Sequence, residues 1–216
     1  MQPIATALAV VALCLPLASQ ATTFSGITDT KGDFLATYGG TAADTDLDVV
    51  SASVFYNPGT DMFTLTATMD GAIGKTSSGA YIWGVNRGSG TAAFAAAGFT
   101  GVRFDAVIGL LPNGTGFLPG PGGNAPLPAG SVVIRGNTIT GTISGSMLPS
   151  TGFSNKLDYT WNLWPRDLRY SGLAQISDFA PDNSNFTATA VPEPATHALM
   201  LAGLFAVAGL ARRRRA

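Results

Sequence analysis

The chain has 216 residues, of which 46% are hydrophobic and only 12% are charged, and this composition excludes an ordinary disordered chain. Its 27 glycines follow no G-X-Y period, so a collagen-like chain is excluded as well. When the four terminal arginines and Glu193 are set aside, eight basic and twelve acidic residues remain. This weakly acidic body lacks the basic surface of a nucleic-acid-binding protein, and we expect no nucleic-acid partner.

The N-terminus carries an apolar run over residues 4–18, followed by Ser19, Gln20 and Ala21. Small residues at the first and third positions of that tripeptide are typical of a signal-peptidase site. We therefore expect residues 1–21 to be a secretory signal peptide cleaved after Ala21, although its first six residues contain no Lys or Arg. The single cysteine, Cys14, lies in this segment, so the mature chain forms no disulfide.

Apolar residues alternate with polar ones along much of the body, as in half-buried β-strands. Two such runs, residues 48–56 and 62–69, flank a segment with Pro58 and Gly59. Proline and glycine favour a turn, so these runs predict a hairpin. Further strands are expected at residues 80–85, 101–111, 131–135, 137–146, 158–164 and 186–190.

One stretch of the body, residues 112–130, is rich in proline and glycine and predicts a long surface loop without regular structure. No segment of the body has a sustained helical period. The pattern predicts a single all-β domain over residues 22–190, folded as an antiparallel β-sandwich or jelly-roll. Residues 46–69 and 131–149 also resemble carbohydrate-binding β-sandwiches of the family 9 and DOMON-like type.

The body has few residues suited to catalysis, because His197 and Glu193 are the only residues of their kinds and both lie near the C-terminus. Serine and cysteine triads, zinc sites built on His or Cys, and glutamate-based glycosidases are thereby excluded. A pair of aspartates can still hydrolyse a glycosidic bond, but no spacing selects a pair. We expect a non-catalytic protein, and a secreted Asp-dependent carbohydrate-active enzyme is the alternative.

Acidic residues gather in two places in the body. The first group stands at alternate positions, as in the first half of a calcium-binding loop, and consists of Asp44, Asp46 and Asp48. The EF-hand pattern is incomplete there, since Val49 and Phe55 occupy the positions of its glycine and glutamate. Two interpretations stay open: a calcium site, or an exposed strand edge whose carboxylates prevent pairing. The second segment, residues 178–183, either ligates the same kind of ion or forms a turn.

Aromatic residues concentrate in residues 159–167. Alternation places Tyr159, Trp161 and Leu163 on one face of a strand and Trp164 on the other. If the first face belongs to the core, Trp164 points outward near Arg166, and an exposed ring with polar neighbours can stack on a sugar. Trp161, Trp164 and Arg166 are therefore candidate glycan-binding residues, and the alternative is that both tryptophans lie in the core.

The C-terminal segment joins three unlike elements in a fixed order. A short motif with Pro192, Glu193 and Pro194 precedes an apolar run over residues 195–211, and a basic cluster follows, made of Arg212, Arg213, Arg214 and Arg215. As a helix, the apolar run is about 25 Å long, at the short end of what spans a bilayer. The positive-inside rule places the arginines in the cytoplasm and the body outside the inner membrane.

This order of elements resembles the PEP-CTERM protein-sorting signal over residues 191–216. The resemblance implies that Pro192, Glu193 and Pro194 are recognised by exosortase, an integral-membrane protease of Gram-negative bacteria that make exopolysaccharide. The body would then be released from a transient inner-membrane anchor to the cell surface or extracellular matrix, where we expect it to bind exopolysaccharide. A plain tail anchor is the alternative.

Overall fold

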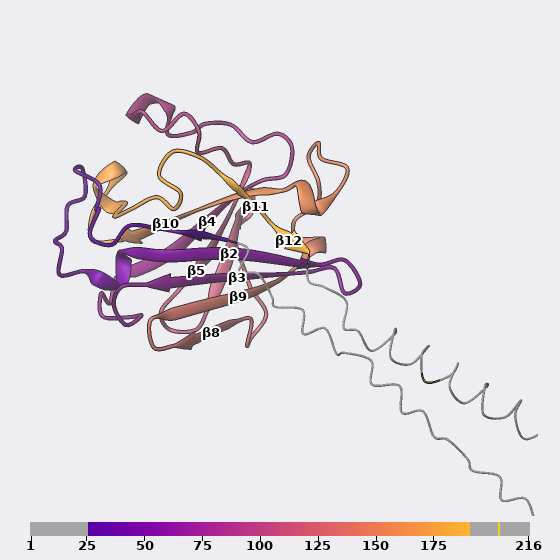
Figure 1. The fold of residues 1–216 in the computed structure, drawn as a ribbon, viewed down its shortest axis with the longest axis horizontal. Coiled ribbons are helices and arrows are strands. Elements are labelled where there is room, and N and C mark those ends of the chain that lie inside the picture. The colour runs from indigo at the N-terminus through magenta and orange to yellow at the C-terminus, as the bar shows by residue number, and fades with distance from the viewer. Residues whose placement is uncertain (1–25, 191–202, 204–216) are drawn as a thin grey trace, which may run out of the picture.

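The computed structural model describes residues 26–190 and Gly203. Residues 26–190 form two six-stranded sheets and short 3-10 helices, with no α-helix among them. The sheets pack face to face (Figure 1), so the predicted all-β class is confirmed and the fold fits a β-sandwich. The expected signal peptide, including Ala21, and the expected transmembrane helix lie outside the described residues. Within the described part, no helix is long and apolar enough to cross a membrane.

The first sheet contains the predicted hairpin. Its strands, in spatial order, are β1 (Ile27–Thr28), β2 (Val49–Asn57), β3 (Met62–Met69), β9 (Thr138–Ser144) and β8 (Val132–Arg135), and β12 (Thr189–Ala190) pairs in parallel with β2. Asn57 and Met62 close the hairpin as paired residues. The side-chain oxygen of Asn57 accepts hydrogen bonds from the backbone N–H groups of Gly59 and Thr60, at 2.9 and 3.2 Å, which fixes the turn.

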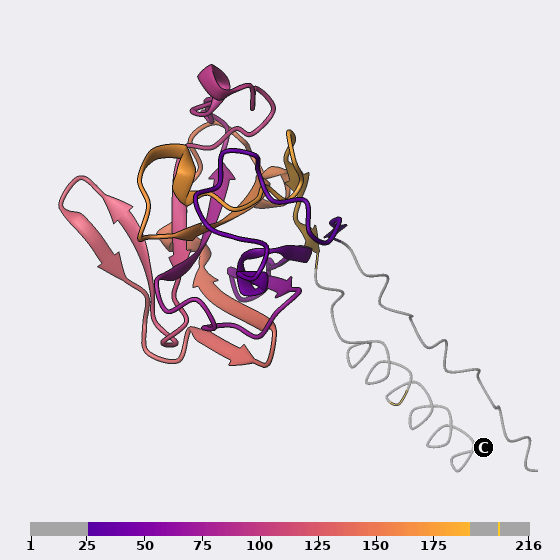
Figure 2. The same cartoon turned by 90° about the vertical axis from the view of Figure 1, so that its left-hand side faces the viewer.

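The second sheet is formed by β11 (Phe186–Thr187), β10 (Thr160–Asp167), β4 (Gly79–Asn86), β5 (Ala106–Leu110), β6 (Gly116–Gly120) and β7 (Gly123–Pro126). The prediction of an irregular loop over residues 112–130 is wrong, because β6 and β7 form a hairpin there. This hairpin continues the second sheet beyond β5 (Figure 2). Its prolines are tolerated because Pro126 lies on the edge strand β7 and Pro119 lies on the part of β6 that extends past its pairing with β5. An absent N–H breaks few ladder hydrogen bonds at such positions.

A core of aliphatic and aromatic side chains lies between the sheets. The ring of Phe63 on β3 lies 5.2 Å from that of Trp161 on β10 and 5.8 Å from that of Tyr159, measured between centroids. All three side chains are fully buried. Burial of each such side chain contributes about 1.5–3 kcal/mol to stability, so packing can hold together a domain without disulfides.

A second, smaller core covers the opposite face of the second sheet. Its buried members are Ala80, Ile82, Val102, Trp164, Ile176 and Phe179. Phe94, Phe99 and Phe104, from the loop between β4 and β5, pack against them. Strands β4 and β10 are consequently buried on both faces.

Candidate functional site

The aromatic residues expected to bind a glycan lie in the two cores. Trp161 faces the core between the sheets and Trp164 faces the second core, so the predicted division of faces is confirmed. Trp164 is nevertheless fully buried, with its ring centroid 4.8 Å from that of Phe104 and 5.3 Å from that of Phe94. The interpretation in which Trp164 points into solvent is therefore wrong, because the loop between β4 and β5 covers its face. The alternative, that both tryptophans lie in the core, is confirmed.

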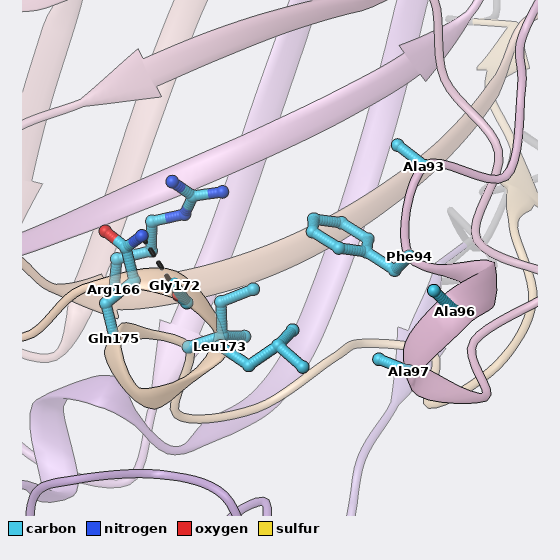
Figure 3. A pocket seen from close by; sticks show the side chains of 9 residues that line it. Ala93, Phe94, Ala96, Ala97, Arg166, Gly172, Leu173 and Gln175 are labelled. Carbon is cyan, nitrogen blue, oxygen red and sulfur yellow. Dashed lines mark hydrogen bonds between the residues drawn. The ribbon is translucent and has the colours of Figure 1, made fainter.

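Arg166, the third of these residues, lies at the edge of the second core and borders a pocket of about 370 Å³. The residues lining this pocket are Ala93, Phe94, Ala96, Ala97, Arg166, Gly172, Leu173, Gln175 and Ile176. Figure 3 shows Arg166, Leu173 and Gln175 on one side and the ring of Phe94 on the other. The pocket thus has an apolar wall that includes Phe94, and facing it a polar side with the guanidinium group of Arg166 and the amide group of Gln175.

The guanidinium group of Arg166 has unused hydrogen-bonding capacity. Its Nε atom is buried and has no acceptor, and Arg166 belongs to none of the ion pairs within residues 26–190. The adjacent Asp167 is engaged by Arg169 and by the hydroxyl of Ser78, at 2.6 Å. Burial lowers the pKa of Arg166, but an arginine keeps its charge in proteins. The pocket therefore has a cationic donor that can bind a polar or anionic ligand.

The first predicted calcium group does not come together in the structure. The carboxylate of Asp46 accepts hydrogen bonds from the backbone N–H and hydroxyl of Thr76, at 2.8 and 2.7 Å. Asp44 instead accepts from the hydroxyl of Tyr38, and Asp48 from the backbone N–H of Gly32. Since Asp46 and Asp48 are 0% and 2% exposed, the exposed-edge alternative is wrong for both of them.

Asp48 belongs to a different group, here named the aspartate cluster. It consists of Asp29, Asp33, Asp48, Asp178 and Asp182. One carboxylate oxygen each from Asp33, Asp48 and Asp178 lie within 4.8 Å of one another, and the same holds for Asp29, Asp33 and Asp182. Asp33 is shared, so the two triads form one continuous site. Five of the twelve aspartates of the body thus gather at one place.

Hydrogen bonds between side chains and the backbone hold together the three chain segments that build the cluster. Oδ2 of Asp178 accepts from the N–H of Val49 at 3.1 Å, and Oδ2 of Asp48 accepts from the N–H of Gly32 at 2.8 Å. Between them, the hydroxyl of Ser177 donates to the carbonyl oxygen of Leu47 at 2.7 Å. The segment around residues 29–33, the start of β2 and residues 177–182 are therefore fixed to one another.

The carboxyl groups of the cluster have no basic partner within the described residues. None of its five carboxylates takes part in an ion pair of the described residues. Burial and nearby carboxylates raise the pKa of Asp178 to about 8 and that of Asp29 to about 6. Burial also raises the pKa values of Asp33 and Asp48.

Fold and site together define a β-sandwich domain with two polar features, a carboxylate cluster and a pocket bordered by an arginine. The class of the tail follows from comparison: residues 190–215 match the family model of the PEP-CTERM protein-sorting motif, which confirms the resemblance. This motif marks an exported protein of the cell envelope or surface that is targeted to exosortase. The positions of Pro192, Glu193, Pro194 and the four arginines lie outside the described residues. A comparison with curated proteins found no match.

Proposed function

We propose that the protein is a non-catalytic component of the cell surface or extracellular matrix that binds exopolysaccharide in the Arg166 pocket. The observation that carries this proposal is a partly buried arginine without an ion-pair partner beside an open, apolar-walled pocket. The sorting motif supports it, because the resembled sorting system occurs in bacteria that make exopolysaccharide.

The pocket offers complementary groups for a sugar residue. Phe94 and Leu173 provide apolar surface for the C–H face of a pyranose ring. Arg166 donates to a ring hydroxyl or to a uronate carboxylate. The amide nitrogen of Gln175 donates to the carbonyl oxygen of Gly172 at 3.0 Å, which orients the amide oxygen as an acceptor for a sugar hydroxyl (Figure 3).

Two observations favour binding over hydrolysis at this pocket. Glycoside hydrolysis normally uses two carboxyl groups on either side of the scissile bond, and no Asp or Glu lines the Arg166 pocket. The body also contains no histidine, cysteine or glutamate. An Asp-dependent enzyme remains the alternative. Such an enzyme would hydrolyse the polymer and release new reducing ends, which can be measured.

Retention on native matrix polysaccharide tests the proposal. The purified extracellular protein is compared with Arg166→Gln and with Arg135→Gln, which removes an equal charge from an exposed position on β8. We expect Arg166→Gln to bind about tenfold more weakly, since one charged hydrogen bond contributes roughly 1.5–3 kcal/mol, and Arg135→Gln to bind like the native protein. Equal retention of all three proteins excludes the pocket, and release of reducing ends supports the enzyme.

A further inference from the structure

We propose that the aspartate cluster, formed by Asp29, Asp33, Asp48, Asp178 and Asp182, is a calcium-binding site. It shares no residue with the Arg166 pocket, and the proposal does not depend on glycan binding. Three observations support it: the spacing of the carboxylates, the buried oxygens that lack a partner, and the absence of a basic residue paired with them in the described part of the chain.

The spacing suits one large cation in each triad. Calcium binds six to eight oxygen ligands at about 2.3–2.6 Å, so two ligands of the same ion stand no more than about 5 Å apart. The ligand oxygens of Asp33, Asp48 and Asp178 lie within 4.8 Å of one another, and so do those of Asp29, Asp33 and Asp182. An all-carboxylate set of this kind favours calcium over zinc, which prefers nitrogen and sulfur, and over magnesium, which keeps several waters.

Buried oxygens without partners provide the independent observation. Asp48 and Asp178 are 2% and 1% exposed. Each uses Oδ2 to accept a backbone hydrogen bond and leaves Oδ1 buried without a partner, and Oδ2 of Asp29 and Oδ1 of Asp33 are buried and free as well. Buried charged oxygens are strongly disfavoured unless they are paired or coordinate a metal. One divalent cation at each triad gives these four oxygens a partner.

Lys31, the basic residue nearest in sequence to Asp29 and Asp33, does not fill that role. Lys31 lies between Asp29 and Asp33 in the sequence, but its ammonium group pairs with Asp70. The side chain of Lys31 is 62% exposed. The cluster thus has no ammonium partner from Lys31, and the exposed carboxyl group of Asp182 gives a cation a route from solvent.

Bound calcium would join distant parts of the chain. Its ligands come from residues 29–33, from Asp48 immediately before β2, and from residues 178–182, which cover the second sheet. The ligand-bearing side chains of Asp48 and Asp178 are already oriented by the backbone N–H groups of Gly32 and Val49. Such outer hydrogen bonds position ligands before the ion arrives.

Calorimetric titration of the full-length chain, stripped with a chelator and then dialysed, tests the proposal with calcium chloride as the probe. We expect one or two calcium ions per chain and a higher melting temperature with calcium, because a ligand that binds the native state stabilises it. Magnesium chloride at equal concentration should have a smaller effect. A folded native protein that gives no binding heat and no change in melting temperature with calcium overturns the proposal.

Matched variants separate ion binding from folding. Asp182→Asn alters an exposed ligand, so it should fold normally and bind calcium at least about tenfold more weakly. Asp178→Asn should abolish the increase in melting temperature given by calcium without lowering the melting temperature in chelator. Asp158→Asn, an exposed aspartate outside the cluster, is the control. If Asp182→Asn and Asp178→Asn both bind calcium like this control, the site lies elsewhere and the proposal is wrong.

Discussion

Oδ2 of Asp178 accepts a hydrogen bond from the backbone N–H of Val49 at 3.1 Å, across 129 positions of sequence. This contact ties the start of β2, in the first sheet, to the segment that covers the second sheet. It uses one carboxylate oxygen and leaves the other, Oδ1, buried without a partner. The same side chain is therefore a structural acceptor through Oδ2 and carries an unsatisfied buried oxygen, Oδ1.

Because of these two roles, two substitutions of Asp178 should affect the free energy of unfolding differently in calcium-free solution. Asp178→Asn keeps a side-chain oxygen for the N–H of Val49 and replaces a carboxyl whose ionised form burial disfavours with a neutral amide. It should therefore leave the free energy of unfolding unchanged or increase it. Asp178→Ala leaves that N–H buried without an acceptor and should destabilise the protein by about 1–3 kcal/mol. Urea unfolding in chelator measures both values. Equal destabilisation by the two variants would contradict the assignment.

Burial of Trp164 gives a second prediction. Trp164→Ala removes a ring packed against Phe94, Phe104 and Phe179, and truncation of a buried tryptophan costs about 3–5 kcal/mol. We expect a loss of this size in the free energy of unfolding, measured with urea. An exposed ring would give a change within about 0.5 kcal/mol, and that result would contradict its place in the second core.

The strands that could be predicted from the sequence are those with one buried face, because their apolar and polar residues alternate. Strand β3 alternates between partly buried and buried residues along its whole length, and its bounds, Met62–Met69, match those predicted. Strands β6 and β7 escaped prediction because they contain Pro119 and Pro126, which are tolerated only at a sheet edge. Residues 186–190 were predicted as one strand, but they divide between the two sheets as β11 and β12.

The candidate sites were harder to predict because chain segments distant in sequence build them. Asp48 and residues 178–183 were recognised as possible ion ligands, whereas Asp29 and Asp33 form no motif on their own. Only the fold brings these three segments together. Likewise, the pattern of β10 correctly placed Trp164 opposite Trp161, but it carries no signal that Phe94 and Phe104 cover that face. The phenylalanines of the loop between β4 and β5 were the available sign of a second core.

The sorting motif at residues 190–215 predicts the form of the protein found outside the cell. Processing by exosortase should remove the segment after about Val191. Intact-mass measurement of the native extracellular protein reads the C-terminus directly, with the protein from a strain without exosortase as the control. If most extracellular molecules retain residues 197–216, the motif is not processed in this chain.

An ion pair between Arg87, the residue after β4, and Asp105, the residue before β5, gives a prediction on pH. Oδ1 of Asp105 accepts a hydrogen bond from Nε of Arg87 at 2.8 Å, and Oδ2 accepts from the N–H of Ser89 at 3.1 Å and from the hydroxyl of Thr151. Burial alone would raise the pKa of Asp105, but the bonds from Arg87, Thr151 and Ser89 outweigh it and hold the pKa below the ordinary value of 3.8.

The sign of the effect follows from this lowered pKa. In the unfolded chain Asp105 takes up a proton near pH 3.8, while the folded protein resists protonation, so its stabilisation is complete above that pH and is lost as the pH falls through the folded pKa. Asp105→Asn should therefore lower the free energy of unfolding by about 1.5–3 kcal/mol at pH 7, equally at pH 5, and by less at pH 3. Urea unfolding at the three pH values measures the difference, with the exposed Asp158→Asn as the control. A difference between native and Asp105→Asn protein that stays constant down to pH 3 would show that the charge of Asp105 does not stabilise the fold.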